Sequence, residues 1–225
     1  MNNFDLNTAD ISELLKRKLG ETVYRGSEGV MVRESDNGTV MTDIDDMDKI
    51  LSLTDNLDGV RLLTVKNRSL ADEFIKKGYF TGGTFCSQWV YIKPECPDSP
   101  ECDIRVMPEN LVKDAARYYT HKHDSTPYMR ERLKAGGLFG AFVDNTLAGF
   151  IGTHSEGSMG MLTVIPEYRR RGLAVCLETY MLKYHISRGE IPFCHVVDGN
   201  DASIALQAKL GLIKAEKPII WLHKD

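Results

Sequence analysis

The 225-residue sequence lacks several features that would place it quickly in a class of proteins. No apolar run approaches the roughly 20 residues of a membrane-spanning helix, so we expect no membrane partner. Lys and Arg total 28 against 32 Asp and Glu, and the net charge of -4 argues against nucleic-acid binding, which requires a basic face. The N-terminal stretch has no apolar core after an early positive segment, unlike a secretory signal. We therefore expect a cytoplasmic protein.

Cysteine is also sparse and shows no recognisable spacing. The five cysteines are odd in number and form no Cys-x-x-Cys pair. We interpret them as reduced thiols, and a disulfide or metal role for Cys96 and Cys102 is the less favoured alternative. No ligand set with metal-binding spacing accompanies these two residues, so we expect no metal cofactor.

What is present is typical of a globular protein with a substantial core. Hydrophobic residues make up 42% of the chain and charged residues 27%. The length allows one large or two small domains. Pro94, Pro97 and Pro100 crowd residues 94–102, where they oppose both helix and central strand. This segment is predicted to be a linker between an N-terminal domain, residues 1–93, and a larger domain, residues 103–225.

The second domain alternates between strand and helix patterns. Apolar alternation, helical periodicity and turn residues give the following order. We predict a strand at 103–107, helices at 109–121 and 126–136, a hairpin at 138–154 turning at Asp144-Asn145, a strand at 158–164, a helix at 170–188, a strand at 193–197, a helix at 201–211 and a strand at 218–224. This order predicts a mixed α/β (α+β) layer structure.

The two halves share one pattern. Asn67 and Asn200 each follow an apolar strand, and each is followed eleven residues later by a glycine, Gly78 or Gly211. Both units then continue into a strand that contains tryptophan. We therefore predict that residues 1–93 form a smaller, degenerate relative of the second domain.

One stretch in the second half predicts an anion site. The sequence IPEYRRRGLA, residues 165–174, turns a corner on Pro166 and runs three arginines into the start of a helix. The first backbone N–H groups of a helix have no partner within it, and the helix dipole adds positive potential there. Gly172 has no side chain and allows a phosphate to approach the main chain. The first half has no counterpart to this stretch.

Arg169-x-x-Gly172-x-Ala174 resembles the signature of the GNAT superfamily of N-acetyltransferases. The later stretch HVVDGNDASIALQAKLGL resembles the second motif of that superfamily, and the combination is most similar to its glycine N-acyltransferase-like branch. The resemblance covers residues 103–225. It implies a mainly antiparallel GNAT sheet with helices on both faces, in which two strands splay apart around an acyl thioester.

The resemblance also implies a binding site for acetyl-CoA or another short acyl-CoA. Main-chain groups of Leu162, Thr163 and Val164 should hold the pantetheine arm. Asn200 should face the same arm or simply cap the helix that follows it. The coenzyme pyrophosphate should be wrapped by Arg169, Arg170, Arg171, Gly172, Leu173 and Ala174.

The catalytic residues are less clearly implied. Relatives often carry a glutamate at the position of Ser158, and Glu156 would lie on the same face of the strand if the strand extends that far. Glu156 is therefore the candidate base, with a plain surface role as the alternative. His154 and His195 are weaker candidates. Gln207 stands where many relatives place a tyrosine, which leaves the group that protonates the thiolate unassigned.

We therefore expect an N-acyltransferase that acetylates a primary amine of a small molecule in a ternary complex. The alternatives are a non-catalytic or regulatory coenzyme-A-binding module and a protein N-terminal acetyltransferase. We expect a monomer or a homodimer. The sequence carries no recognisable code for the acceptor.

Overall fold

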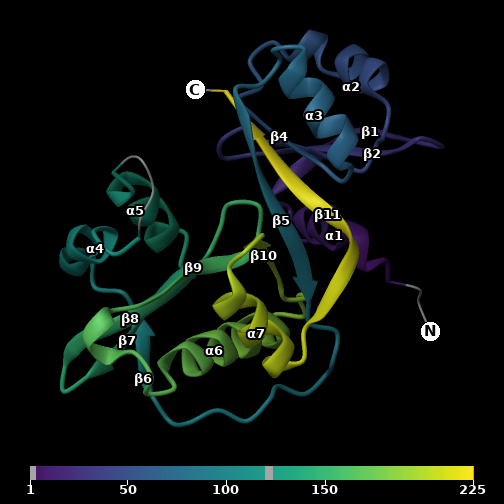
Figure 1. The fold of residues 1–225 in the computed structure, drawn as a ribbon. Coiled ribbons are helices and arrows are strands. Elements are labelled where there is room, and N and C mark those ends of the chain that lie inside the picture. The colour runs from purple at the N-terminus through teal and green to yellow at the C-terminus, as the bar shows by residue number, and fades with distance from the viewer. Residues whose placement is uncertain (1–3, 120–123, 225) are drawn as a thin grey trace.

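The computed structural model describes residues 4–119 and 124–224. These residues form one mixed sheet of eleven strands flanked by helices (Figure 1). The strands are β1 Gly20–Gly26, β2 Gly29–Glu34, β3 Val40–Thr42, β4 Leu62–Val65, β5 Gly82–Val90, β6 Asp103–Val106, β7 Leu138–Val143, β8 Thr146–Thr153, β9 Met159–Val164, β10 Phe193–Val197 and β11 Ile213–His223. The α-helices are α1 Ala9–Lys16, α2 Met47–Leu53, α3 Arg68–Lys76, α4 Glu109–Ala116, α5 Thr126–Lys134, α6 Leu173–Ser187 and α7 Asp201–Leu210.

The order of strands in the sheet is β1-β2-β3-β4-β11-β5-β10-β9-β8-β7-β6. All pairs are antiparallel except β3 with β4 and β9 with β10. Helices cover both faces of the C-terminal part. α6 packs on one face through Leu177 and Met181, whereas α4 and α5 pack on the other through Val112 and Met129. The fold class predicted from the sequence is confirmed.

Two strands are exchanged between the halves of the chain. β5 belongs to the first half by sequence but lies between β10 and β11, and β11 from the end of the chain lies between β4 and β5. Trp89 of β5 is buried in the core beneath α6, and Leu222 of β11 is buried in the core beneath α3. Figure 1 shows these two strands running side by side between the halves. Each half therefore completes the sheet of the other.

Local signals in the sequence correspond to local geometry. Asp144 and Asn145 both adopt positive φ, 48° and 60°, in the tight turn between β7 and β8. The side chain of Asn67 accepts a hydrogen bond from the Leu70 backbone N–H at 3.3 Å, and α3 begins at the next residue. Asn200 caps α7 in the same way, and Gly211 ends it in the left-handed conformation at φ 83°.

Several predicted boundaries are wrong. The helix predicted at 109–121 ends at Ala116, and its last two predicted residues lie outside the described part of the chain. The helix predicted from 170 begins at Leu173, because Arg170 and Gly172 both have positive φ. The strand predicted at 218–224 begins at Ile213, and Pro218 lies at a shift in its register, where a missing N–H is tolerated.

The prediction that all five cysteines are reduced thiols is also wrong. Cys102 and Cys176 form a disulfide with a Cα–Cα distance of 6.3 Å, and Cys86, Cys96 and Cys194 are free. The pairing spans 74 positions and arises because the proline-rich segment folds back over the first turns of α6. No local spacing could signal such a contact.

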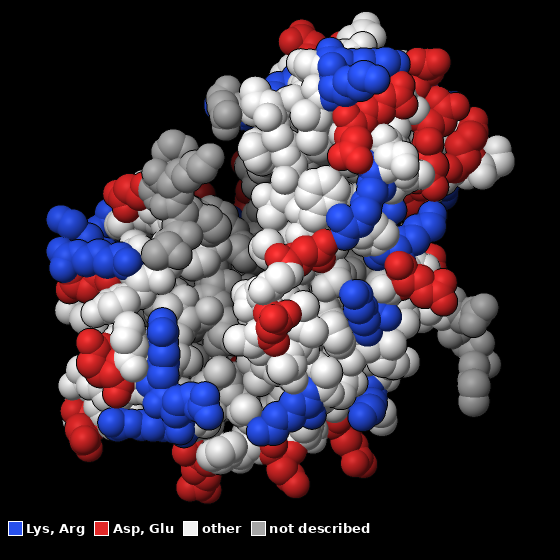
Figure 2. Space-filling model, in the orientation of Figure 1, with Lys and Arg blue, Asp and Glu red and all other residues white. Residues whose placement is uncertain are grey.

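Figure 2 shows Lys, Arg, Asp and Glu interspersed over the visible face, with acidic side chains dense over the upper part. Helices within residues 4–119 and 124–224 are all too short or too polar to cross a bilayer.

Candidate active site

The loop between β9 and α6 has the geometry of an anion-binding turn. After β9 the chain makes a short 3-10 helix, Pro166–Tyr168, and then reaches Gly172, which has φ 84° at the N-cap of α6. No side chain caps this helix, so its first backbone N–H groups remain available to a ligand. A Cβ atom on Gly172 would contact only Pro100 Cγ, at 3.6 Å. The positive φ, rather than crowding, is therefore what requires glycine in this turn.

A pocket of about 670 Å³ lies against this loop. Of the ten residues predicted to bind the coenzyme, nine line the pocket and one does not. The nine are Leu162, Thr163, Val164, Arg169, Arg170, Gly172, Leu173, Ala174 and Asn200. The exception is Arg171, whose guanidinium carbon lies 5.5 Å from the centre of the Tyr168 ring. Arg169 both lines the pocket and donates from Nε to the Val164 carbonyl oxygen at 3.2 Å.

The parallel strands β9 and β10 pair at a single position, Met159 with Cys194. Beyond that pair they diverge around a second pocket of about 160 Å³. Leu162 and Asn200 line both pockets, so the divergence continues the first pocket inward. We refer to this second pocket as the strand gap. It lies where the sequence resemblance predicts two splayed strands.

The catalytic candidates Glu156 and Ser158 are buried, 5% and 2% exposed, and line neither pocket. The expectation that Glu156 lies on a strand face with Ser158 is wrong, because β9 begins only at Met159 and Gly157 turns the chain at φ 98°. The two side chains nevertheless meet, since the Ser158 hydroxyl donates to Glu156 Oε1. A surface role for Glu156 is excluded by its burial.

The Glu156 carboxylate lies among aromatic and ionisable groups. Burial raises the pKa of Tyr119 to about 12, and the Glu156 charge adds to this shift. Burial likewise raises the pKa of Glu34, which lies in the first half, and here too the Glu156 charge adds to the shift. His154 Nδ1 and the Tyr128 hydroxyl form a hydrogen bond of 2.6 Å, and the two rings stack. The turn between β8 and β9 thus holds a buried carboxylate whose charge acts on groups from both halves of the chain.

Of the two weaker candidates, only His195 lines the strand gap. His154 lines a different pocket, of about 150 Å³, near the end of α6. Burial lowers the pKa of His195 to about 3, a shift that the nearby Glu156 carboxylate opposes. His195 is therefore a neutral imidazole at physiological pH.

Glu178 was missed by the sequence reasoning. It lies in the strand gap, 2% exposed, and burial raises the pKa of its carboxyl to about 7 against an opposing hydrogen bond from Gln207. Gln207 lies in the same gap. The available signal was that Glu178 is the one acidic residue in the helix of residues 173–187 and follows five uncharged, mostly apolar residues. Within the described ranges, no group of three His, Cys, Asp or Glu side chains is arranged to hold a metal ion.

The chain was compared with known protein families and solved structures, and both comparisons found similar proteins. The model of the FR47-like protein family matches residues 137–222. A Drosophila melanogaster protein superposes with a TM-score of 0.68 at 18% identity, covering 98% of this chain and 88% of that one. A GNAT-family protein from Novosphingobium aromaticivorans superposes with a TM-score of 0.61 at 18% identity, covering 94% and 93%.

A tandem GNAT protein from the clavulanic acid biosynthesis pathway also superposes, with a TM-score of 0.53 at 15% identity, covering 95% of this chain and 86% of that one. No curated protein sequence matches this chain. At these identities the likeness shows the fold, which is that of GNAT proteins and extends over both halves of the chain.

Proposed function

We propose that the chain is an acyl-CoA-dependent N-acyltransferase of the glycine N-acyltransferase-like branch. It would transfer acetyl from acetyl-CoA to a primary amine of a small molecule by direct attack in a ternary complex. The observation that carries this proposal is the convergence of nine of the ten predicted coenzyme residues on one pocket that continues into the strand gap. We propose a cytoplasmic enzyme that acts as a monomer or homodimer and needs neither nucleic acid nor membrane.

The coenzyme would be held by this chain's own groups. The free N–H groups at the start of α6 and the Arg170 side chain would hold the pyrophosphate, and β9 would hold the pantetheine arm along the first pocket. Bound acetyl-CoA supplies an activated thioester carbonyl. The thioester would then lie where the first pocket meets the strand gap, close to a main-chain N–H near Val164 that would support the developing oxyanion.

The acceptor side favours an amine. Buried carboxylates of Glu156 and Glu34 lie near one another and attract a cationic group. The amine must lose a proton before it attacks, and Glu156, whose charge acts on His195 in the strand gap, is the proposed acceptor of that proton, directly or through a water. The Gln207 amide can donate a hydrogen bond but is not an acid, so the thiolate must be protonated by another group or by solvent.

The N-terminal half would be a relative of the C-terminal half that has lost the phosphate loop. The matching Asn67 and Asn200 caps and the left-handed Gly78 and Gly211, at φ 77° and 83°, support this assignment. Residues 1–93 would then wall the acceptor side, and the chain would hold one active site.

Calorimetric titration with acetyl-CoA tests the coenzyme site. Arg170→Gln should weaken binding about tenfold, because a hydrogen bond to a charged group contributes about 1.5–3 kcal/mol and Arg170 is partly solvated. Arg171→Gln is the matched control and should change affinity little, since its side chain does not line the pocket. Equal losses in both variants, or no binding by the wild type, would remove the proposed coenzyme site.

Turnover with a panel of amines tests the reaction. Glu156→Gln should lower turnover about 100-fold, as expected for a lost general base, and leave acetyl-CoA affinity intact. Glu131→Gln, an exposed acid on α5, is the control. Acetyl-CoA binding without turnover on any amine would instead favour a coenzyme-binding module, and turnover confined to peptide N-termini would favour a protein acetyltransferase.

A further inference from the structure

His195 on β10 and Gln88 on β5 face one another across an antiparallel pair. His195 Nε2 and Gln88 Oε1 are 3.0 Å apart. Gln88 comes from the first half of the chain and reaches this position only because β5 is inserted beside β10. The contact thus joins the half that lacks a phosphate loop to a residue of the strand gap.

The orientation of the Gln88 amide is fixed by its other end. Gln88 Nε2 donates to the Leu6 backbone carbonyl oxygen at 2.6 Å, and the residue is 1% exposed. Since the amide NH₂ serves Leu6, the atom that faces His195 is the carbonyl oxygen, which can only accept. His195 must therefore donate from Nε2. A neutral imidazole carries one N–H, so its Nδ1 bears a lone pair.

Nδ1 of His195 is buried and has no hydrogen-bond partner among residues 4–119 and 124–224. A buried acceptor left unpaired costs about 1–3 kcal/mol. Strand β10 continues beside the gap, which His195 lines together with Leu162 and Asn200. An unpaired acceptor on a side chain that lines the strand gap is the kind of feature that a substrate N–H would satisfy.

The charges around the imidazole keep it neutral. Glu156 from the turn before β9 favours its protonation, whereas Lys66 after β4 and His154 after β8 oppose it, and burial opposes it most. Lys66 is itself paired with Asp10 of α1 at 2.5 Å. The rings of Phe193 and Trp221 flank the imidazole at centroid distances of 5.6 and 5.7 Å.

We propose that Gln88 is a positioning residue that holds His195 as the Nε2–H tautomer, and that His195 Nδ1 accepts a hydrogen bond from the N–H of the attacking amine. This inference rests on the proposed function and deepens it. The hydrogen bond orients the amine so that its lone pair faces the thioester carbonyl, while the proton that the amine loses goes to Glu156. The acceptor must then present an N–H to Nδ1 when it attacks.

The tautomer is measured in the protein without coenzyme or amine. Long-range ¹H–¹⁵N spectra of histidine-labelled protein should show His195 as neutral Nε2–H between pH 6 and 8, with the signal assigned by its loss in His195→Asn. Gln88→Glu places a carboxylate opposite Nε2 and should make His195 doubly protonated at neutral pH. Gln88→Met removes the acceptor, keeps the strand apolar, and should release the tautomer preference. An Nδ1–H tautomer or an imidazolium in the wild type overturns the inference.

Turnover and coenzyme binding are measured on the same proteins. Gln88→Glu and Gln88→Met should each lower kcat/KM for the amine at least tenfold, leave acetyl-CoA affinity unchanged, and shift the pH profile in the glutamate variant alone. His223→Asn, a histidine substitution on β11, should change neither quantity. Unchanged kcat/KM in a variant whose tautomer has changed overturns the role of His195. Failure of the wild type to bind acetyl-CoA overturns the proposed function instead, and the spectra still decide the tautomer.

Discussion

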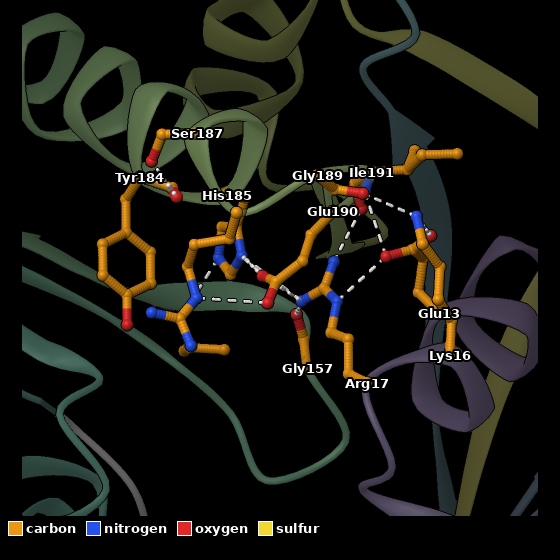
Figure 3. Close-up of polar contacts among 12 residues, drawn as sticks. Glu13, Lys16, Arg17, Gly157, Tyr184, His185, Ser187, Gly189, Glu190 and Ile191 are labelled. Atoms are coloured by element: carbon orange, nitrogen blue, oxygen red, sulfur yellow. Dashed lines mark hydrogen bonds and ion pairs between the residues drawn. The ribbon is translucent and has the colours of Figure 1, made fainter.

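Replacing Arg17 with methionine should be among the most destabilising single changes in this chain. Arg17 follows α1 and its side chain is 5% exposed. Figure 3 shows it between α1 and the end of α6. Its Nε donates to Glu13 at 3.0 Å, Nη1 donates to the Gly157 carbonyl oxygen at 2.7 Å, and Nη2 donates to the Ile191 carbonyl oxygen at 2.7 Å. The guanidinium thus joins the first half to the turn that carries Glu156.

Two carboxylates depend on this guanidinium. Glu13 is 2% exposed at its side chain, and Glu190, 16% exposed, lies 3.6 Å from Arg17 Nη1. Burial alone would raise the pKa of Glu190, but the hydrogen bond from His185 and the charge of Arg17 outweigh it and the pKa is lowered. Methionine keeps an unbranched apolar stem and removes every donor. Both carboxylates would lose a buried cation, and two carbonyl oxygens would lose a partner.

The expected loss of stability in Arg17→Met follows from the burial of this ion pair. Removing one partner of a buried ion pair costs about 3–5 kcal/mol, because it leaves an uncompensated charge away from water. For a chain of this size each kcal/mol lowers Tm by about 2–4 °C, so we expect a fall of about 10 °C. Arg188→Met is the matched control. It removes a cation from the same Glu190, 3.2 Å away, but Arg188 is 55% exposed and should cost less than about 1 kcal/mol.

Denaturation by guanidinium chloride at pH 7, followed by circular dichroism, measures the free energy of unfolding of Arg17→Met and of Arg188→Met. The acetyl-transfer rate of Arg17→Met should also fall, since Gly157 is released beside Glu156, while that of Arg188→Met should not. Equal destabilisation of the two variants would show that the buried network contributes no more than a surface pair, and the reasoning from burial would then be refuted.

Three further predictions concern protons and thiols. Burial lowers the pKa of His185, so the unfolded state binds more protons below about pH 6.5, and stability should fall as the pH drops below that value. His185→Asn should flatten that fall in denaturant titrations. Burial raises the pKa of Glu178 to about 7, so the folded state holds the carboxyl proton more tightly than the unfolded state, whose pKa is 4.5. The stability that this proton gives is present below about pH 4.5 and is lost as the pH rises. In the same assay, Glu178→Gln should be about 2 kcal/mol more stable than the wild type at pH 8 and nearly equal to it at pH 4. Alkylation of the native protein, read by mass spectrometry, should leave Cys102 and Cys176 unmodified until reductant is added. Reduction should lower the free energy of unfolding by at most about 4.5 kcal/mol for a loop of 74 residues.

Features that depend on neighbours in sequence could be predicted. The turn at Asp144-Asn145, the caps at Asn67 and Asn200 and the glycine at the start of α6 are each specified by a few adjacent residues whose backbone preferences agree. Nine of the ten residues that the family resemblance assigns to the coenzyme lie on one strand, one loop and one helix start, so a short motif could locate them; Asn200 lies apart from them at the N-cap of α7. Arg171 shows the limit of this reasoning, since its direction depends on the Tyr168 ring beside it.

Features that depend on distant segments could not be predicted. The exchange of β5 and β11 gives no local sequence signal, because a buried strand has the same apolar pattern whichever strand it pairs with. The disulfide from Cys102 to Cys176 and the contact from Gln88 to His195 span 74 and 107 positions. Glu156 was identified on a strand-face argument that the turn at Gly157 makes invalid, and its burial depends on segments of the first half.

The strand exchange also explains why an N-terminal half without a phosphate loop is retained in the site. A cut at the proline-rich segment would remove β5 from between β10 and β11, and with it Trp89 from the core beneath α6 and Gln88 from His195. The exposed edge of β10 would then be free to pair with another chain. The same cut would remove Arg17 from the turn before β9. The first half therefore supplies the strand that closes the C-terminal sheet and the contacts that orient the residues around the strand gap, so the two halves are one structural unit for the proposed reaction.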